Sequence, residues 1–462
     1  MPNSAVGGTC IIGPPRRSTS KESTVFKKRQ VGRTIAAAVA LSVGLALAGC
    51  SSTGASSGGD VKGGDYSGPK VTVTFWNGWT GGAAPVLVPK LVAKFNAEHK
   101  NIVVKDVPME WGDISAKMPL AIKAGKGPDV AVAHGDDIAT YAAQGLLLKD
   151  DGILKSLGYS ADDFPKGLLA DGNYKDAQYG IPWSVTPLGL YVNKDVLKQA
   201  GLDPETIPTT KDDYLATLAK LKTAGVQGEW VDGYVFTGTF ELESLIWQFG
   251  GDLFNDDVTK ATFNSDAGVQ ALTYMTDLIK EGYSPAKVAQ DGDFNALVGG
   301  KTAFNWNGVW QTTNDALAKD DWTAAAVPQI GSEKAVWSSS THWIFPSNKG
   351  QSKDETAAAA TFVKWMNDNS AGWAATGELP AQNSVREDPK LLTDYPKLKP
   401  FLDELPYAHY ETVAPGITSA TATITTALNE AILGKKTPKA ALDDAAAKAD
   451  QLLQQNASQY GG

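Results

Sequence analysis

Thirteen tryptophans, all of them after Cys50, are the side chains of this sequence with the clearest potential for chemistry. An indole has a large apolar face and one N–H donor, so it either packs in a core or stacks on an apolar ligand surface. Trp247 and Trp365 lie among aliphatic residues at helical spacing, which predicts core packing for both. Trp79 and Trp111 instead follow the ends of predicted strands, where ligand contact is the favoured interpretation.

Residue patterns for metal, nucleotide or thiol chemistry are absent from the sequence. The cysteines are Cys10 and Cys50 alone, and the four histidines show no His-x-x-x-His spacing, so we expect no metal site and no cofactor: His99, His134, His342 and His409. Gly299-Gly300-Lys301-Thr302 resembles the end of a phosphate-binding loop. Asn295 occupies the position of its first glycine, which excludes nucleotide binding there.

The first third of the chain alternates strand and helix patterns that would position these side chains. Val71–Trp76 alternates as a strand does, residues 88–95 repeat apolar positions at helical spacing, and Ile102–Val104 is a second strand. This order predicts a βαβ unit within a parallel sheet, with Val130–Ala133 as a third strand. Ligands of such sheets bind beyond the strand ends, which here are the loops Trp76–Trp79 and His134–Asp137.

The stretch from Gly180 to Asp195 organises the middle of the chain. Pro182 and Pro187 lack a donor N–H, which predicts that neither lies inside a central strand. Residues 188–192 alternate as a half-buried strand, and Asn193 is predicted to cap a short helix that ends at Gly201. These residues alone fit a hinge between two lobes as well as they fit an ordinary strand and helix of one domain.

Capping residues predict where several other helices begin. Asp113 and Thr210 are placed to cap helices, and Asp213 lies three residues after Thr210. Asp136 or Asp137 would open the helix that ends at Gly145. Thr437-Pro438 begins the final helix, since proline suits its first turn.

The N-terminus carries a secretion signal. Basic residues at 27–33 precede the uncharged run 35–48, which is too short for a confident membrane span and ends in Leu47-Ala48-Gly49-Cys50. Small residues followed by cysteine resemble the bacterial lipobox, in which the cysteine is lipidated. We therefore predict a lipoprotein signal peptide over residues 1–49, lipidation of Cys50, and a Ser/Gly-rich tether over residues 50–69.

The charge of the remaining chain restricts its partners. The whole chain has 42 basic and 51 acidic residues, and removal of residues 1–49 leaves 35 and 50, a net charge of −15. Such a surface repels nucleic acid, which we exclude as a partner. Arg386 is the one arginine left, and anionic ligands are usually held by guanidinium groups, which disfavours phosphates and carboxylates as ligands.

Six short segments, in order between residues 74 and 310, together resemble a known family. The chain resembles the extracellular solute-binding proteins of bacterial ABC importers, family 1, the carbohydrate-binding group that includes maltose-binding protein. The matching segments are Thr74–Trp79, Gly127–Val130, Tyr141–Leu147, Gly180–Asp195, Gly250–Phe254 and Gly300–Phe304 with Asn307–Trp310.

This resemblance implies an α/β, periplasmic-binding-protein-like fold of type II, with two α/β lobes joined by crossing strands around a ligand cleft. The expected N-terminal lobe comprises residues 70–181 and 327–378, and the C-terminal lobe residues 182–326 and 379–462. The implied function is capture of a neutral sugar or oligosaccharide by hinge closure. A monomer on the extracellular face of a Gram-positive cell membrane, anchored by lipid at Cys50, would deliver the ligand to the transmembrane subunits of an ABC permease.

The resemblance also selects ligand-binding candidates. Trp310 matches the family's stacking tryptophan, Asp136 or Asp137 falls where the family places a carboxylate for hydroxyl groups, and Thr186 replaces an acid of the maltose binder, which argues against maltose. Aromatic faces suit the C–H face of a sugar, and short polar groups suit its hydroxyls. The full predicted set is Trp76, Asn77, Trp79, Glu110, Trp111, Asp136, Asp137, Trp183, Thr186, Glu241, Trp310, His342 and Trp343.

Two other functions stay open at this point. A secreted glycan hydrolase would also need tryptophans and a pair of carboxylates, although no local motif presents such a pair. A receptor for another small solute, such as a metal chelate, is the second alternative. No enzymatic activity is expected.

Overall fold

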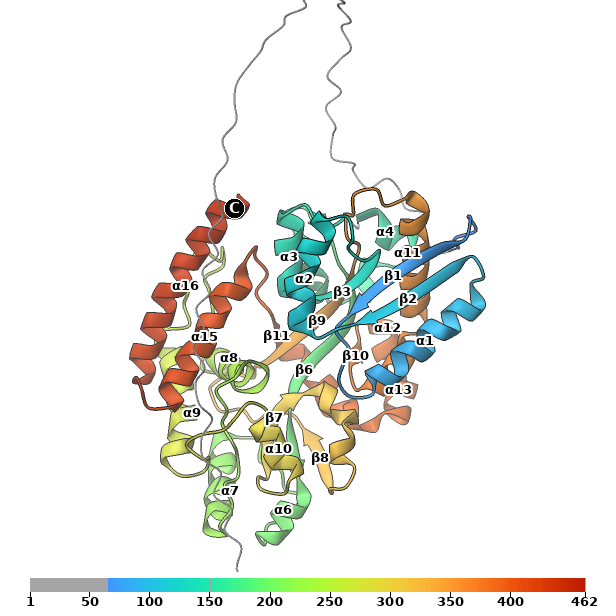
Figure 1. Ribbon diagram of the computed structural model, residues 1–462. Helices are drawn as coiled ribbons and strands as arrows, with labels where there is room; N and C mark the ends of the chain where they lie inside the picture. The colour runs from blue at the N-terminus through green and yellow to red at the C-terminus, as the bar shows by residue number, and fades with distance from the viewer. Residues whose placement is uncertain (1–64, 150, 462) are drawn as a thin grey trace, which may run out of the picture. The chain divides into compact units, whose positions relative to one another are not determined.

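The computed structural model describes residues 65–149 and 151–461. The predicted signal peptide, Cys50 and the first part of the tether lie outside these residues. Figure 1 shows the arrangement of helices and strands. The strands are β1 (Val71–Asn77), β2 (Ile102–Pro108), β3 (Val130–His134), β4 (Asn173–Tyr174), β5 (Ala177–Gln178), β6 (Ile181–Asn193), β7 (Phe304–Gly308), β8 (Trp322–Ala325), β9 (Val336–Ile344), β10 (Leu379–Pro380) and β11 (Ala408–Tyr410).

Helices cover the sheet and build the remainder of both lobes. They are α1 (Ala84–Glu98), α2 (Trp111–Lys123), α3 (Gly135–Ala143), α4 (Asp151–Ser156), α5 (Lys166–Asp171), α6 (Lys194–Gln199), α7 (Lys211–Thr223), α8 (Phe240–Gln248), α9 (Asp266–Lys280), α10 (Gly292–Val298), α11 (Lys353–Asp368), α12 (Asn383–Arg386), α13 (Pro389–Asp394), α14 (Lys399–Glu404), α15 (Ile417–Ile432) and α16 (Pro438–Tyr460). Within the described residues, no helix has the length and apolar character needed to cross a membrane.

The predicted βαβ unit is confirmed. β1 pairs in parallel with β2 over its whole length and with β3 at Phe75 and Trp76. The sheet is mixed, however, because β9 joins β3 in antiparallel orientation. Its strand order is β10-β6-β9-β3-β1-β2.

The strand β6 is the predicted crossing, and it belongs to both lobes. Residues up to Pro187 pair with β9 and β10, whereas Leu188 and the residues after it pair with β7 and β8. One continuous strand therefore changes partners between Pro187 and Leu188. This change decides the question that the sequence left open, in favour of a link between two lobes.

The prediction that Pro182 and Pro187 lie outside a central strand was wrong, because both are part of β6. The ladder accommodates them at its irregular points. Its register shifts between Pro182 and Ser184, and Pro187 is the last residue that pairs with β9. A proline at such a position withholds no donor that a regular ladder would need.

The helix starts follow local chemistry in most cases. The side chains of Asn193, Thr210 and Thr437 accept hydrogen bonds from the first turns of α6, α7 and α16, as predicted. Asp113 does not cap α2: the helix begins two residues earlier, and Asp113 lies in its first turn. There the negative charge still favours the positive end of the helix dipole.

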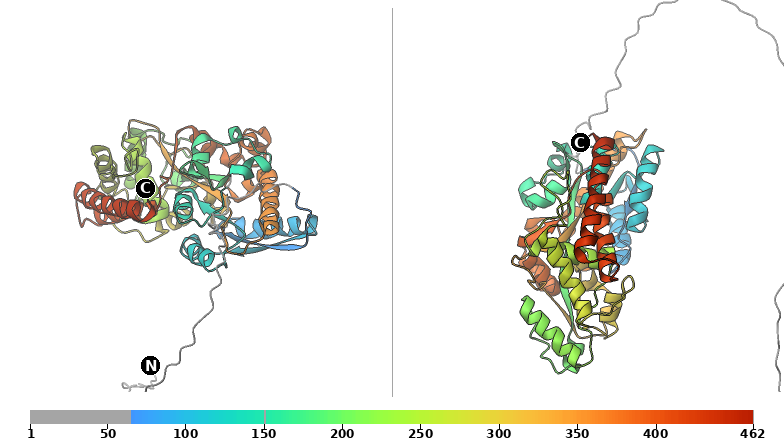
Figure 2. Two further views of the ribbon diagram at one scale, coloured as in Figure 1. Left: turned by 90° about the horizontal axis from the view of Figure 1, so that it is seen from above. Right: turned by 90° about the vertical axis from the view of Figure 1, so that its left-hand side faces the viewer.

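Two separate groups of buried residues form the cores of the two lobes. The N-terminal lobe packs α1 and α11 against the sheet around Phe75, Phe95 and Phe362, and Figure 2 shows α11 beside β1 and β2. The C-terminal lobe packs α7, α8, α9, α15 and α16 around residues such as Tyr214 and Met275. A third cluster, which includes Tyr191 and Phe401, fills the space beside β6.

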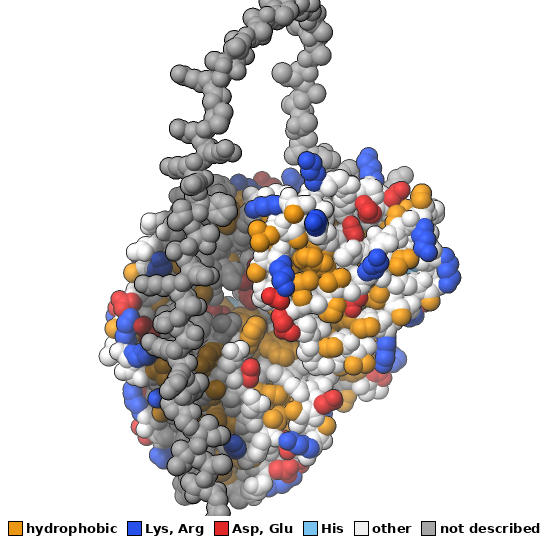
Figure 3. Space-filling model, viewed as in Figure 1, with side chains coloured by type: hydrophobic (Ala, Val, Ile, Leu, Met, Phe, Trp, Pro, Cys, Tyr) orange, Lys and Arg blue, Asp and Glu red, His pale blue; other side chains and the backbone are white. Residues whose placement is uncertain are grey.

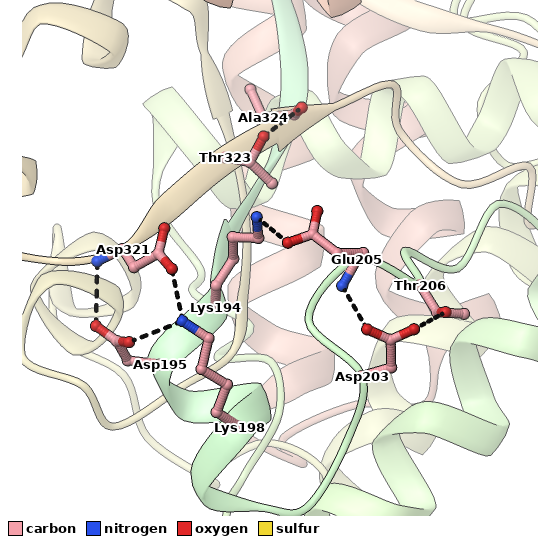
Figure 4. Close-up of polar contacts among 9 residues, drawn as sticks. All are labelled: Lys194, Asp195, Lys198, Asp203, Glu205, Thr206, Asp321, Thr323 and Ala324. Atoms are coloured by element: carbon pink, nitrogen blue, oxygen red, sulfur yellow. Dashed lines mark hydrogen bonds and ion pairs between the residues drawn. The ribbon is translucent and has the colours of Figure 1, made fainter.

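An exposed network of charges ties α6 to the start of β8 (Figure 4). The Lys198 ammonium lies 2.6 Å from Asp321 and 3.5 Å from Asp195, and the Asp321 N–H donates to Asp195. Lys194 pairs with Glu205 on the other side of the helix. Because the groups other than Lys194 are exposed, the network contributes little to stability and mainly fixes the orientation of α6.

Candidate functional site

Trp111 and His134 cover the ends of the strands β1 and β3. Their ring centroids lie 4.1 Å apart. The indole also lies over Gly78, where an added Cβ would come within 2.2 Å of the ring. Only glycine permits this approach, so the Asn77-Gly78 turn predicted as a strand end also makes room for Trp111. Both rings are half-buried and keep part of their surface open.

The first turn of α3 places two carboxylates beside these rings. Asp136 and Asp137 directly follow the end of β3, and both are half-buried. Ser115 donates a 2.7 Å hydrogen bond to Asp137 from α2. Gly135 makes this arrangement possible, because an added Cβ would lie 3.0 Å from Asp171 and 3.1 Å from the Ser340 hydroxyl.

The strand β9 and the loop after β11 supply the back of the site. The Ser339 hydroxyl lies 3.1 Å from His134 Nδ1 and donates to Glu411 at 2.9 Å. Its neighbour Ser340 donates to Asp171 at 3.0 Å. Thr186 of β6 donates to the Ser339 carbonyl at 3.3 Å. The crossing strands therefore hold a row of small polar groups between the two lobes.

The C-terminal lobe meets the N-terminal lobe at the start of α15. The Gly416 N–H donates to Thr140 Oγ1 at 2.8 Å, and Thr418 Oγ1 donates to Asp136 at 3.3 Å. Figure 3 shows a hollow on this face, between the part that carries α15 and α16 and the part that carries α2 and α3, with acidic side chains at its edge. Asp136 is therefore the point at which both lobes reach the same side chain.

Burial and mutual repulsion change the titration of these acids. Burial, and then the charge of Asp136, raises the pKa of Asp137 to about 6, and burial raises the pKa of Asp136 itself. Burial lowers the pKa of His134, although the charge of Asp137 opposes this effect. An aromatic face, an imidazole and closely spaced carboxyl groups thus line one hollow, a set that can stack on a ring and bond its polar substituents.

Three of the predicted tryptophans lie in the core of the N-terminal lobe instead. Trp79, Trp183 and Trp343 are 3%, 2% and 0% exposed. The ring centroids of Trp79 and Trp373 are 4.4 Å apart, and those of Trp183 and Trp343 are 5.1 Å apart. Packed indoles of this kind have no open face for a ligand in this structure. The structure therefore does not bring them together with Trp111 and Asp136.

Two polar candidates are engaged within the protein. Asn77 is fully buried, and its amide bonds Asp106 at 2.6 Å and the Trp79 N–H at 3.1 Å. His342 is fully buried with Nε2 3.0 Å from the Leu168 carbonyl, and burial lowers its pKa to about 4. These contacts engage both side chains within the protein, and the His342 ring also lies 3.5 Å from the hydroxyl of Ser340, which bonds Asp171.

The remaining candidates lie around the edges or elsewhere. Glu110 is exposed at the start of α2, and Trp76 is half-buried against the core beneath that helix. Trp310 covers Gly308, and its carbonyl lies 3.3 Å from where a Cβ on Gly82 would be, which places it next to the loop before α1. Glu241 is buried in the C-terminal lobe among other acids, Glu229 foremost, and not beside Asp136.

Several polar residues around this hollow were not among those predicted from the sequence, namely Ser115, His134, Asp171, Glu243, Ser339, Glu411 and Thr418. His134 lies in a loop that the strand pattern predicts as a place for ligand binding, so its role could have been predicted. Glu243 stands out as an acid within the apolar helix α8. Nothing local marks Ser339 or Glu411, because their position depends on pairing between segments 205 and 72 residues apart.

Comparisons with known proteins identify the family and the fold of the chain. The pattern of the family described as bacterial extracellular solute-binding protein matches residues 69–373. The sn-glycerol-3-phosphate-binding periplasmic protein UgpB of Escherichia coli strain K12 is 25% identical over 446 residues, which cover 90% of this chain and 96% of that protein.

Similar solved structures include an ABC transporter solute-binding protein of Thermotoga lettingae bound with α-D-tagatose. It has a TM-score of 0.72 and 25% identity, and the match covers 83% of this chain and 99% of that one. The cyclic α-maltosyl-1,6-maltose binding protein of Arthrobacter globiformis has a TM-score of 0.70 and 25% identity. The match covers 84% of this chain and 100% of that one.

UgpB of Mycobacterium tuberculosis, in complex with glycerophosphocholine, has a TM-score of 0.73 at 21% identity. The match covers 84% of this chain and 99% of that one, and it shows similarity of fold alone. The type II two-lobe architecture predicted from the sequence is thereby confirmed. The family pattern spans about two thirds of the sequence, and the chain belongs to the bacterial extracellular solute-binding protein family.

Proposed function

We propose that this protein is the solute-capturing component of an ABC importer and that its ligand is a sugar or a sugar-like polyol. The observation that carries the proposal is the convergence of both lobes on Asp136, beside the partly open indole of Trp111. A solute in the hollow would touch groups of both lobes at once. Such a ligand favours the closed arrangement by its additional contacts.

The chemistry of the hollow supports a polyhydroxylated ligand. Half-buried carboxylates and serine hydroxyls from α3, β9 and the loop after β11 offer many acceptors for hydroxyl groups. Trp111 offers an apolar face for the C–H side of a ring. We assign ligand contact to Trp111, Asp136 and Asp137 from the sequence set, keep Trp310 and Thr186 as further candidates, and add His134 and Glu411.

Cellular placement and delivery belong to the same proposal. The lipobox-like Leu47-Ala48-Gly49-Cys50 and the Ser/Gly-rich segment after it support lipid anchoring at Cys50 outside the cell. The two lobes would correspond to residues 70–181 with 327–378 and to residues 182–326 with 379–462. The loaded monomer would then present its closed form to the membrane permease.

sn-Glycerol-3-phosphate is the second candidate ligand, because the similar protein UgpB of Escherichia coli is an sn-glycerol-3-phosphate-binding protein. The hollow supports it poorly. Arg386, the single arginine after Cys50, donates to the carbonyls of Pro380 and Ala381 and to Asn383 and so is committed elsewhere. The acids that line the hollow would repel a phosphate.

A binding experiment tests the proposal. The soluble protein, residues 65–462, is titrated with mono- and oligosaccharides, polyols and sn-glycerol-3-phosphate, with calorimetry and tryptophan fluorescence as readouts. Saturable binding of a sugar or polyol without product formation on chromatography is the expected result. Turnover of an oligosaccharide would instead indicate a hydrolase, and tight binding of the phosphate alone would replace the proposed ligand class.

A further inference from the structure

The hollow holds more carboxyl groups than the recognition of hydroxyl groups needs. Five carboxyl groups from four segments line it. Burial raises the pKa of each, and the charge of Asp136 raises the pKa of the other four further. These are Asp137, Asp171, Glu243 and Glu411 together with Asp136 itself. Their hydrogen-bond partners are hydroxyl groups of Ser115, Ser340, Ser339 and Thr418.

No lysine or arginine of the described residues pairs with this group, and the base beside it is His134, whose pKa is lowered by burial. The lysine ion pairs found among residues 65–149 and 151–461 do not include any of the five acids. Clustered carboxylates away from water are unfavourable unless they gain protons or a counter-charge. In the empty protein, bound protons can neutralise these carboxylates. A ligand that carries a positive charge would neutralise them as well.

Glu243 is an independent pointer to such a ligand. It is 2% exposed, and its Oε1 has no hydrogen-bond partner among the described residues. It lies on α8, which contacts β9 through the bond from the Trp337 N–H to Ser244, and β9 also pairs with β11 directly before Glu411. A buried acceptor that is left without a donor costs free energy, and a group bound in the hollow would supply the missing donor to Glu243.

We propose that the solute is a polyol or sugar that carries an ammonium group, and that Asp136, Glu243 and Glu411 together hold this charge between the lobes. This inference rests on the proposed function, because it specifies the chemistry of the solute in the same hollow. An ammonium group has three donors and no acceptor, which suits the carboxylate oxygens of these three acids. A bare metal ion is not favoured, since the described residues contain no group of ligands arranged to hold one.

The direct test compares solutes that differ only in charge. The probes are glucose, galactose and mannose, their 2-amino derivatives, the N-acetyl derivatives of these amines, and the 6-phosphates, together with chitobiose in its amine and diacetyl forms. Titration is done by calorimetry at about pH 6.5, where the amines are protonated. We expect an amine to bind at least about tenfold more tightly than its hydroxyl and N-acetyl analogues, and to weaken as salt is added.

Variants identify the acids that hold the charge. Glu243→Gln and Asp136→Asn should each reduce the ratio of amine to hydroxyl-analogue affinity by about tenfold or more. Glu229→Gln is the matched control, because Glu229 is equally buried in the C-terminal lobe and also lacks hydrogen-bond partners among the described residues. This control should leave the ratio unchanged.

The outcomes separate this inference from the proposed function. If a neutral sugar binds and its amine analogue binds equally or more weakly, the charge inference is overturned while sugar capture stands. If a phosphate binds most tightly, both are wrong. If no member of the panel binds, the proposed ligand class fails, and the ammonium inference fails with it.

Discussion

Thr418 Oγ1 of the C-terminal lobe donates a 3.3 Å hydrogen bond to Asp136 of the N-terminal lobe, across 282 residues of chain. The neighbouring bond from the Gly416 N–H to Thr140 is shorter, at 2.8 Å. Together these contacts join the lobes at the mouth of the hollow, opposite the crossing strands β6 and β9. Asp136 thus accepts a hydrogen bond from the other lobe and is also a proposed contact of the solute.

This arrangement predicts that Thr140→Ala opens the empty protein. The substitution removes the acceptor of the Gly416 N–H and leaves the interior of α3 unchanged. We expect a larger radius of gyration in X-ray scattering and weaker solute binding, because closure would then have to rebuild the contact. Thr421→Ala is the control, since Thr421 bonds only the carbonyl of Ile417 within its own helix. Equal scattering curves for both variants would show that this contact does not hold the lobes.

Trp111→Ala should abolish stacking on the solute while the fold persists. We expect the affinity for the best solute to fall by about tenfold or more, which corresponds to about 1.4 kcal/mol. The comparison variant is Trp365→Ala, whose indole lies on α11, where it bonds Glu98 and packs on Phe95 away from the hollow. Calorimetry should report a loss in the first variant only, and matching affinities would remove Trp111 from the site.

Trp310→Ala gives a separate test of the tryptophan that the family resemblance selected. Its ring covers Gly308 at the end of β7, and its backbone borders the loop at Gly82. If the half-buried ring also contacts the solute, calorimetry will show weaker binding by a similar factor, with little change in the melting temperature. A fall in melting temperature with unchanged affinity would mean that Trp310 only packs.

The sequence predicted the framework of the fold better than the site. Local rules sufficed for the strands β1, β2 and β3, for the caps at Asn193 and Thr210, and for β6 as the crossing element. They failed at Pro182 and Pro187, because a proline is harmless where a ladder shifts register or changes partner, and pairing of that kind is set by distant strands.

The prediction of the site was limited by the same cause. Trp111, Asp136 and Asp137 follow strand ends, so their positions follow from the βαβ order. Trp343 has a similar local pattern and is nevertheless buried, because α11 and the Trp373 segment cover it from far along the chain. Glu243 and Glu411 lie near Asp136 only because α8 and β11 pack against β9.

Trp343→Ala should therefore destabilise the fold. The indole is fully buried and donates to Asn367 at 2.9 Å, so its removal leaves a cavity and an unpaired acceptor. We expect a loss of about 3–5 kcal/mol in the free energy of unfolding, measured by denaturant titration. The protein that remains folded should bind its solute with unchanged affinity. A variant with normal stability and lost binding would return Trp343 to the ligand site.

We expect the protein to be less stable at pH 8 than at pH 5, because several of its acidic side chains are buried. Burial raises the pKa of Glu229 to about 7 and that of Glu243 to about 8, and burial followed by the charge of Glu229 raises that of Glu241. A raised carboxyl pKa means that the folded state binds more protons than the unfolded state between the ordinary value and the raised one. Stability is therefore greatest at the acidic side of this window and is lost as the pH rises through it.

Glu229→Gln tests this pH dependence. The amide is nearly isosteric and carries no charge, and neither carboxylate oxygen of Glu229 has a hydrogen-bond partner within the described part of the chain. We expect the variant to be more stable than the parent at pH 8 by about 1–3 kcal/mol and little changed at pH 5, with a flatter decline between them. Melting temperatures across this range measure the effect, with the exposed Glu281→Gln as control. Parallel curves for parent and variant would contradict the prediction, because they would mean that Glu229 titrates alike in the folded and unfolded chain.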